Sequence, residues 1–265
     1  MNKLNFEHGS FRDPAGKIFY RKDGVYRELS ESGIKRFTFL KKDNLINDLI
    51  KEKFLIFTEE CGEKSNENFG IDKKKLLLKH DKINFISYPY EWTFTQLKDA
   101  ALFHLDLQIY LLNRKAKLID ASAYNIQFKN NRPIFIDILS IDEYEEGEYW
   151  YAHKQFCENF LNPLVLSAKK GIKFNNWFRG NLEGVYTHEI EPLLGIKDFL
   201  SPTLFFHVYL LNKFEEKSKI DPKKANNKIS SLKKFTKKAY QNLLNQLRDY
   251  IKSLNNKKTI SNWDK

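Results

Sequence analysis

The alternation of apolar and polar positions predicts a strand-rich region at the start of the chain. Residues 17–29 contain two short aromatic and β-branched runs on either side of Lys22-Asp23-Gly24. Asp-Gly readily adopts the positive φ of a tight turn, so this pattern predicts a β-hairpin. The polar stretch 58–75 is predicted to be a loop, and residues 76–90 are predicted to supply two further strands.

The hydrophobic period changes from two to 3.6 at Thr93, which predicts a long amphipathic helix. Apolar residues recur at steps of three and four from Phe94 to Leu112. Thr93 or Thr95 is expected to cap the amino end of this helix. Helical patterns return after Tyr149, and they predict a predominantly helical second half.

This order of elements predicts an α+β fold of two lobes. Residues 1–90 form the expected strand-rich N-lobe. Residues 91–216 form a helical C-lobe, and residues 118–140 are expected to be a β-hairpin embedded in it. The remaining residues, 217–265, are predicted to be a basic amphipathic helical tail or linker.

The segment 118–140 carries the most informative polar residues. Asn130-Asn131 is a turn pair between two β-type runs, and a hairpin that pivots there places Asn125 opposite Asp137. Asp120 lies five residues before Asn125 on the incoming loop. Two carboxylates and an amide oxygen at one end of a hairpin are hard ligands of the kind that Mg²⁺ prefers.

This Asp-x4-Asn…Asp pattern resembles the catalytic loop and metal-binding aspartate of kinase-like phosphotransferases, and the aminoglycoside and small-molecule kinases in particular. The resemblance implies a two-lobed protein-kinase-like fold that uses ATP and Mg²⁺. Asp120 would orient the hydroxyl group of a glycan or small molecule, and Asn125 and Asp137 would coordinate the metal.

The chain departs from the kinase pattern in several places. Leu118-Ile119 replaces His-Arg, Asp137-Ile138-Leu139 replaces Asp-Phe-Gly, and no G-x-G-x-x-G loop precedes them. Arg27 is the best substitute for the phosphate-pairing lysine, with Glu31 as its candidate partner, although Arg and Lys are not equivalent. Two interpretations therefore remain open, an active phosphotransferase and a catalytically inactive kinase-like recognition or scaffold module. In a third, the Asp and Asn residues serve only local turns and caps.

The segment from Tyr88 to Trp92 lies between the predicted lobes, where a kinase hinge binds adenine. Tyr88 and Glu91 are the candidate cofactor-binding residues there. Tyr90 and Trp92 are expected to seal the lobe interface by packing.

Longer segments resemble one bacterial family whose members are named as methyltransferases or nodulation-type proteins. The matching segments are FRDPAG (11–16), YR (26–27), SG (32–33), ISYPYEWTFTQLKDAAL (86–102), DASAYNIQF (120–128), RPIFIDILS (132–140) and QFCENFLNPL (155–164). The resemblance implies that this region precedes an S-adenosylmethionine-dependent methyltransferase domain, in cis or as a partner. No acidic-x-G-x-G-x-G loop occurs here, so no methyl-donor site is expected, and the chain is either a truncated piece or a solitary version.

The distribution of charge and the few cysteines and histidines limit which partners, cellular location and metal sites are expected. The net charge of +11 resides in residues 217–265, which hold 14 basic and three acidic residues, while residues 1–216 hold 31 of each. Binding of nucleic acid or an anionic membrane is therefore expected only through the tail, whose other interpretation is a packed terminal helix. Two distant cysteines, no signal peptide and no apolar span predict a cytoplasmic protein. Six histidines without ligand spacing predict no metal site built from His or Cys.

Overall fold

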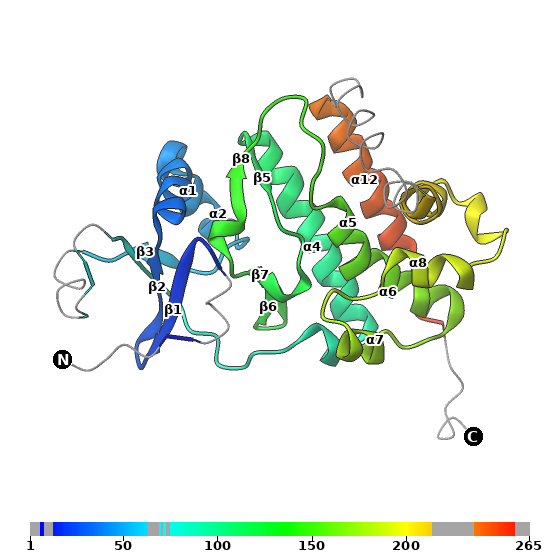
Figure 1. Cartoon of the computed structure of the whole chain (residues 1–265), viewed down its shortest axis with the longest axis horizontal. Coiled ribbons are helices and arrows are strands. Elements are labelled where there is room, and N and C mark those ends of the chain that lie inside the picture. The colour runs from blue at the N-terminus through cyan, green and yellow to red at the C-terminus, as the bar shows by residue number, and fades with distance from the viewer. Residues whose placement is uncertain are drawn as a thin grey trace. The chain divides into compact units, whose positions relative to one another are not determined.

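The computed structural model describes residues 6–7, 13–62, 69, 71–72, 75–213 and 236–257. The chain divides into two compact units (Figure 1). Unit 1 comprises residues up to Ile86 together with Ile126–Glu143, and unit 2 comprises Ser87–Asn125 together with the residues from Tyr144 onward. The expected division near residue 90 assigned all of 118–140 to the helical lobe, whereas residues 126–140 belong to unit 1.

Unit 1 contains a four-stranded antiparallel sheet in the order β1-β2-β4-β3. Its strands are β1 (Gly16–Arg21), β2 (Gly24–Leu29), β3 (Thr58–Glu60) and β4 (Leu77–His80). The predicted hairpin is confirmed, since Arg21 pairs with Gly24. The turn does not use a positive φ, however. Gly24 relieves crowding, because a Cβ there would lie 3.0 Å from the His80 carbonyl oxygen, which is closer than most Cβ contacts in proteins.

Two helices follow the first hairpin, α1 (Glu31–Lys41) and α2 (Leu45–Lys51). The Ser30 hydroxyl caps α1 by accepting from the Gly33 N–H. The stretch 76–90 yields only one strand, β4, so the second strand predicted there is wrong. Pro89 instead begins a 3-10 turn (Pro89–Glu91), which suits a residue whose φ is fixed and whose nitrogen cannot donate to a sheet.

The second hairpin of unit 1 consists of β6 (Ile126–Lys129) and β7 (Arg132–Phe135). Asn130 and Asn131 have φ values of 52° and 61°, as a two-residue hairpin turn requires, and the register pairs Ile126 with Phe135. The Phe135 N–H donates to the Phe54 carbonyl at 2.9 Å, and Ile56 N–H donates to the Phe135 carbonyl at 3.0 Å. These bonds explain why the hairpin belongs to unit 1. A 3-10 turn (Ile138–Ser140) and β8 (Ile141–Glu143) follow.

Unit 2 is built on α4 (Phe94–Asn113). Thr93 caps it as predicted, because its hydroxyl accepts from the Gln96 N–H while the Gln96 side chain accepts from the Thr93 N–H. The helix buries Leu97, Ala101 and Leu105 of the predicted apolar stripe. After α4 come β5 (Ala116–Leu118) and a 3-10 turn (Ala123–Asn125).

From His153 onward, the described elements of unit 2 are all helices or helical turns joined by loops. A continuous helical segment runs through α5 (His153–Phe156), a π-helix (Cys157–Leu161), α6 (Asn162–Val165) and a second π-helix (Leu166–Lys170). Further elements are α7 (Asn175–Gly180), α8 (Thr187–Ile190), 3-10 turns (Glu191–Leu193 and Asp198–Leu200), α9 (Pro202–Leu204) and a third π-helix (Phe205–Leu210).

The described part of the tail is helix α12 (Lys237–Ser253), which lies beside α4 (Figure 1). It buries Tyr240, Leu244, Leu247 and Ile251. The Arg248 Nε donates to Asp106 at 2.5 Å, and the Lys98 Nζ donates to the Leu254 carbonyl at 2.6 Å. The packed terminal helix is therefore what the structure shows for residues 237–253. Across the described ranges, no helix is long and apolar enough to cross a membrane.

Candidate functional site

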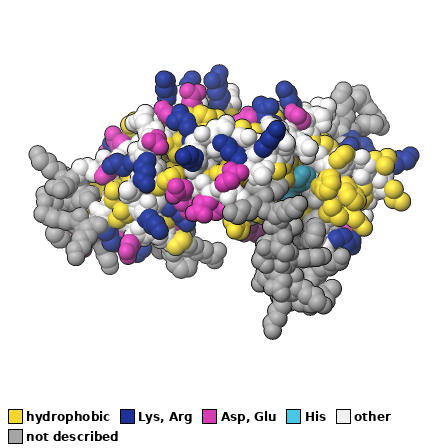
Figure 2. Space-filling model, turned by 90° about the horizontal axis from the view of Figure 1, so that it is seen from above, with side chains coloured by type: hydrophobic (Ala, Val, Ile, Leu, Met, Phe, Trp, Pro, Cys, Tyr) yellow, Lys and Arg dark blue, Asp and Glu magenta, His cyan; other side chains and the backbone are white. Residues whose placement is uncertain are grey.

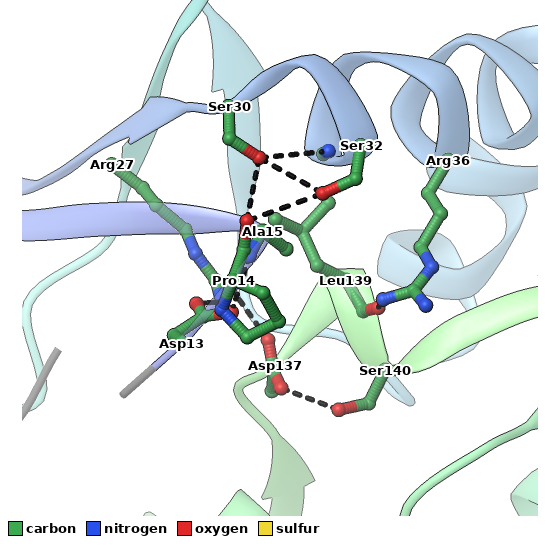
Figure 3. Close-up of polar contacts among 11 residues, drawn as sticks. Asp13, Pro14, Ala15, Arg27, Ser30, Ser32, Arg36, Asp137, Leu139 and Ser140 are labelled. Carbon is green, nitrogen blue, oxygen red and sulfur yellow. Dashed lines mark hydrogen bonds and ion pairs between the residues drawn. The ribbon is translucent and has the colours of Figure 1, made fainter. Parts of the chain in front are cut away.

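A buried ion-pair cluster in unit 1 centres on Arg27 of β2 (Figure 3). Arg27 is 5% exposed, and its Nη1 donates to Asp137 Oδ1 at 2.5 Å. Its Nη2 donates to Asp13 Oδ2. The Ser140 hydroxyl donates to the second oxygen of Asp137. The structure therefore brings together two predicted site residues, Arg27 and Asp137, and adds Asp13 and Ser140, which the sequence analysis missed.

The turn that carries Asp13 is held tightly in place. Asp13 Oδ1 accepts from the Ala15 N–H at 2.8 Å, while the hydroxyls of Ser30 and Ser32 donate to the Pro14 carbonyl at 2.7 and 3.2 Å (Figure 3). A Cβ on residue 33 would lie 2.1 Å from the Ala15 carbonyl oxygen, so only glycine allows α1 to approach the turn this closely. The Asp-Pro-Ala-Gly and Ser-x-Ser-Gly motifs thus act together to fix Asp13 against Arg27.

The charges of this cluster do not cancel. Two carboxylates surround one guanidinium, which leaves one formal negative charge. Burial opposes ionisation of Asp137, but the Arg27 guanidinium and the Ser140 hydroxyl outweigh it and hold the pKa of Asp137 below its usual value. Glu31, the expected partner of Arg27, is exposed on the first turn of α1, so Asp13 takes the place that the sequence analysis gave to Glu31.

The Nε of Arg27 is buried and has no hydrogen-bond acceptor among the described residues. A buried donor on a cationic group without a partner is costly, and an anionic oxygen is the group that would satisfy it best. Asp137 supplies carboxylate oxygens, and the cluster has an excess negative charge. The donor set therefore fits a hard divalent cation and a phosphate oxygen.

In unit 2, the loop after β5 carries Asp120 and Asn125, and side-chain amides hold its backbone. Gln108 of α4 accepts from the Leu118 N–H at 2.8 Å. Gln155 of α5 accepts from the Ala121 N–H at 2.8 Å, and Asn159 accepts from the Ala123 N–H at 3.0 Å. We call these three residues the amide clamp. Because each bond fixes a backbone donor that the loop cannot satisfy by itself, the clamp gives the loop a defined conformation.

Within this loop Asp120 Oδ1 accepts from the Ser122 N–H at 2.6 Å, and Asn125 ends the 3-10 turn. Asn125 directly precedes β6 and Asp137 follows β7 by two residues. The register, in which Ile126 pairs with Phe135, confirms the hairpin itself, while the position of Asn125 opposite Asp137 stays a prediction. Asp120 and Asn125 belong to unit 2, and Asp137 belongs to unit 1. Their convergence on one metal ion stays a prediction.

The predicted adenine-binding residues serve a local cap. The Tyr88 N–H donates to the Glu91 carboxylate at 2.9 Å, and the Tyr88 ring stacks on Tyr90 with centroids 5.3 Å apart. Trp92 is 1% exposed, and its indole N–H donates to the Ser87 hydroxyl at 2.9 Å. Asn175 of α7 donates to the carbonyls of Tyr90 and Trp92, both at 3.0 Å. Trp92 is thus a packing residue, as expected.

Comparison with known proteins supports the nodulation-type resemblance. No family model matches the chain. The chain is 38% identical over 246 residues to the nodulation protein NoeA of Rhizobium meliloti (strain 1021). The match covers 93% of this chain and 51% of NoeA, so the chain spans about half the length of the curated relative that it matches. The chain is therefore homologous to one part of NoeA over nearly all of its own length.

Proposed function

We propose that this chain is a kinase-like phosphotransferase that moves the γ-phosphate of ATP, with Mg²⁺, to a hydroxyl group of a glycan or small molecule. The observation that carries the proposal is the cluster of Arg27, Asp137 and Asp13. It combines a surplus negative charge, which suits Mg²⁺, with a buried cationic N–H donor that lacks an acceptor among the described residues, which suits a phosphate oxygen.

Each residue has a distinct role in this proposal. Asp137 and Asn125 would hold the Mg²⁺ ion, and the ion would neutralise negative charge on the phosphate groups. Arg27 would donate its Nε–H to a phosphate oxygen while its two Nη groups keep Asp13 and Asp137 in position. Asp120 would accept the proton of the acceptor hydroxyl as the oxygen attacks phosphorus. The amide clamp would keep that carboxylate on a loop of fixed conformation.

The test is product formation, measured as ADP release and as a new phosphate ester by phosphorus NMR across a panel of sugars, aminoglycosides and other small hydroxyl compounds. Asp120→Asn is expected to lower the rate by about 100-fold or more, because a positioned base contributes about 10²–10⁴-fold. Asp106→Asn is the matched control, since Asp106 lies in the same unit but pairs with Arg248. A phosphate-ester yield that Asp120→Asn leaves unchanged would contradict the assignment of Asp120.

A second candidate function is a recognition or scaffold module without catalysis, associated with an S-adenosylmethionine-dependent methyltransferase. One surface feature of unit 2 favours it, a group of exposed apolar side chains. Ile196 is 89% exposed, Leu200 is 78% exposed and Phe206 is 58% exposed. Figure 2 shows hydrophobic side chains gathered at the right-hand end of the view. Contiguous exposed apolar surface is typical of protein interaction sites.

The two candidates differ in what the chain does with nucleotide and with a partner. In the scaffold interpretation, the chain forms no phosphate ester and associates with the half of NoeA that lies outside the match, expressed as a separate chain. Leu200→Glu should then abolish association, whereas Tyr20→Glu, at an exposed aromatic residue of unit 1, should not. If the chain forms a phosphate ester and does not associate with that half of NoeA, the scaffold interpretation is excluded and the phosphotransferase interpretation remains.

A further inference from the structure

A buried cluster of two histidines and a cysteine lies inside unit 2, and none of its three residues is assigned to phosphate transfer. His153 Nε2 is 2.7 Å from His207 Nδ1, and Cys157 Sγ is 3.6 Å from His153 Nε2. His153 and His207 are each 5% exposed, and Cys157 is fully buried. The ligand-type atoms of all three lie within 4.8 Å of one another. The expectation that His and Cys form no metal-ligand arrangement therefore missed this cluster.

Irregular helix geometry positions two of the three side chains. His153 and Cys157 are four residues apart on one continuous helical segment, so they share a face. Cys157 is the first residue of one π-helix, and His207 lies within another, Phe205–Leu210. π-helical turns are rare and are found frequently at functional sites. Two of them meeting at one trio of potential ligands is unlike ordinary core packing.

The interatomic distances are close to those of a metal site. In a tetrahedral Zn²⁺ site, bonds of about 2.3 Å to sulfur and about 2.0–2.1 Å to nitrogen place a thiolate about 3.6 Å from an imidazole nitrogen and two such nitrogens about 3.3 Å apart. The Cys157–His153 separation of 3.6 Å already matches. The two histidine nitrogens, at 2.7 Å, share a hydrogen bond, and they would separate by about 0.6 Å when an ion replaces the proton between them.

The surroundings of His153 suit a ligand. Its Nδ1 lies 3.2 Å from the Tyr149 hydroxyl, and the Trp150 ring lies 5.5 Å from the imidazole, so both sides of the ring are held. Metal-binding histidines commonly use their second nitrogen in this way.

We propose that His153, Cys157 and His207 form a binding site for a single transition-metal ion of the zinc and copper class, held by two imidazole nitrogens and one thiolate. Two imidazoles and one sulfur are borderline-to-soft ligands, which select these ions over Mg²⁺. Binding releases one proton, from the Cys157 thiol. The proton between the two histidines moves to Nδ1 of His153, where the Tyr149 hydroxyl oxygen accepts its hydrogen bond.

The experiment uses the full chain with Cys61→Ser, which leaves Cys157 as the sole thiol. Cobalt(II), zinc and copper(I) are supplied both to native protein and during refolding, so that slow entry into a buried site does not hide binding. Cobalt is expected to produce thiolate-to-metal charge-transfer absorption at one equivalent, and competition by zinc and by copper(I) then ranks the two ions. The absence of this absorption in the Cys61→Ser protein would overturn the proposal. This result does not depend on how well any variant of the three ligands folds.

Variants locate the site. Cys157→Ser and His207→Gln are expected to weaken zinc binding by more than about 100-fold, and Tyr149→Phe by about 10-fold, in line with the effects of outer-shell partners. His188→Gln is the matched control, because His188 is exposed on α8. Equal zinc content in the Cys157→Ser protein and its parent, with native circular dichroism in both, would show that the trio is only a buried hydrogen-bonded cluster.

Discussion

The Arg27 guanidinium and the Asp137 carboxylate form an ion pair with an Nη1–Oδ1 distance of 2.5 Å, although 110 residues separate them. The pair joins β2 to the residues that follow β7, so it ties the second hairpin to the four-stranded sheet within unit 1. Arg27 also holds Asp13, which makes one buried cation the partner of two carboxylates. The stability of unit 1 and the proposed chemistry therefore depend on the same side chain.

Replacing Arg27 should destabilise the protein far more than replacing a nearby surface arginine. Arg27→Met leaves two partly buried carboxylates without a cation, and the expected loss in the free energy of unfolding is about 3 kcal/mol. Arg36→Met is the control, because Arg36 pairs with Asp142 at 3.4 Å with both side chains about a third exposed, and its expected loss is about 0–1 kcal/mol. Urea unfolding measures both values, and equal losses would contradict the central role of Arg27.

The ion pair should also produce a defined loss of stability in acid. The folded-state pKa of Asp137 lies below its unfolded value of about 3.9, so its contribution is complete well above that pH and disappears as the pH falls through the folded pKa. Asp137→Asn should therefore be less stable than wild type at pH 7, and the difference should shrink on acidification below about pH 5. Ser140→Ala removes a hydroxyl donor to Asp137, so it should move the acid transition to higher pH. Unfolding midpoints of wild type and the two variants are measured from pH 7 to pH 3. A difference between wild type and Asp137→Asn that stays constant over this range would refute this prediction.

His104 is predicted to be a destabilising residue. Its two ring nitrogens are buried and have no hydrogen-bond partner within the described ranges, and the ring packs against both Phe156 and Phe160. His104→Leu should raise the free energy of unfolding by about 1–3 kcal/mol at pH 7. Burial lowers the pKa of His104 to about 3, so the neutral ring is protonated more readily in the unfolded chain, and wild-type stability falls as the pH drops below about 6.5.

The difference in the free energy of unfolding between His104→Leu and wild type should consequently increase by about 2 kcal/mol from pH 7 to pH 5. Chemical denaturation at the two pH values measures it. His188→Gln, at the surface, should stay within about 0.5 kcal/mol of wild type at pH 7. A leucine variant that is less stable than wild type would show that the ring has partners the hydrogen-bond pattern does not reveal.

The amide clamp should control the loop that carries Asp120. Gln155→Met removes the acceptor of the Ala121 N–H, and the expected cost is about 1–3 kcal/mol. Hydrogen exchange at Ala121 should accelerate, because this amide loses the Gln155 side-chain oxygen that accepts its hydrogen bond. Gln241→Met is the control, since Gln241 bonds the exposed Asn113 side chain at 2.9 Å. Unchanged exchange at Ala121 would mean that the loop holds its conformation without the clamp.

Local sequence signals predicted the local geometry well. Asn130 and Asn131 adopt the left-handed conformation that short polar side chains tolerate, and Thr93 and Gln96 form the reciprocal cap. Both features are fixed by neighbouring residues, so the sequence contains nearly all the required information. The second strand predicted within residues 76–90 is wrong, because aromatic β-type residues dominated the pattern there, while Pro89 favours the start of a helical turn.

Sequence patterns did not predict which side chains from distant segments form pairs. Asp13 and Asp137 meet Arg27 across 14 and 110 residues, and nothing in the local sequence favours them over Glu31. The four-residue spacing of His153 and Cys157 was a usable signal, but His207 lies 54 residues further along. The sequence therefore indicated which residue types matter, and the packing of the elements decided which of them meet.

Isothermal titration calorimetry with Mg·ATP tests the proposed function most directly. Wild type and Asp142→Asn are expected to bind Mg·ATP equally, because this substitution weakens the partly exposed pair with Arg36 and leaves an amide oxygen to accept from the Glu143 N–H; removal of Mg²⁺ should weaken binding. Asp137→Asn is expected to bind at least about 10-fold more weakly, because a metal ligand is lost while the Asn side chain keeps the shape of the original. No heat of binding for wild type, or equal affinities for wild type and Asp137→Asn, would contradict the account.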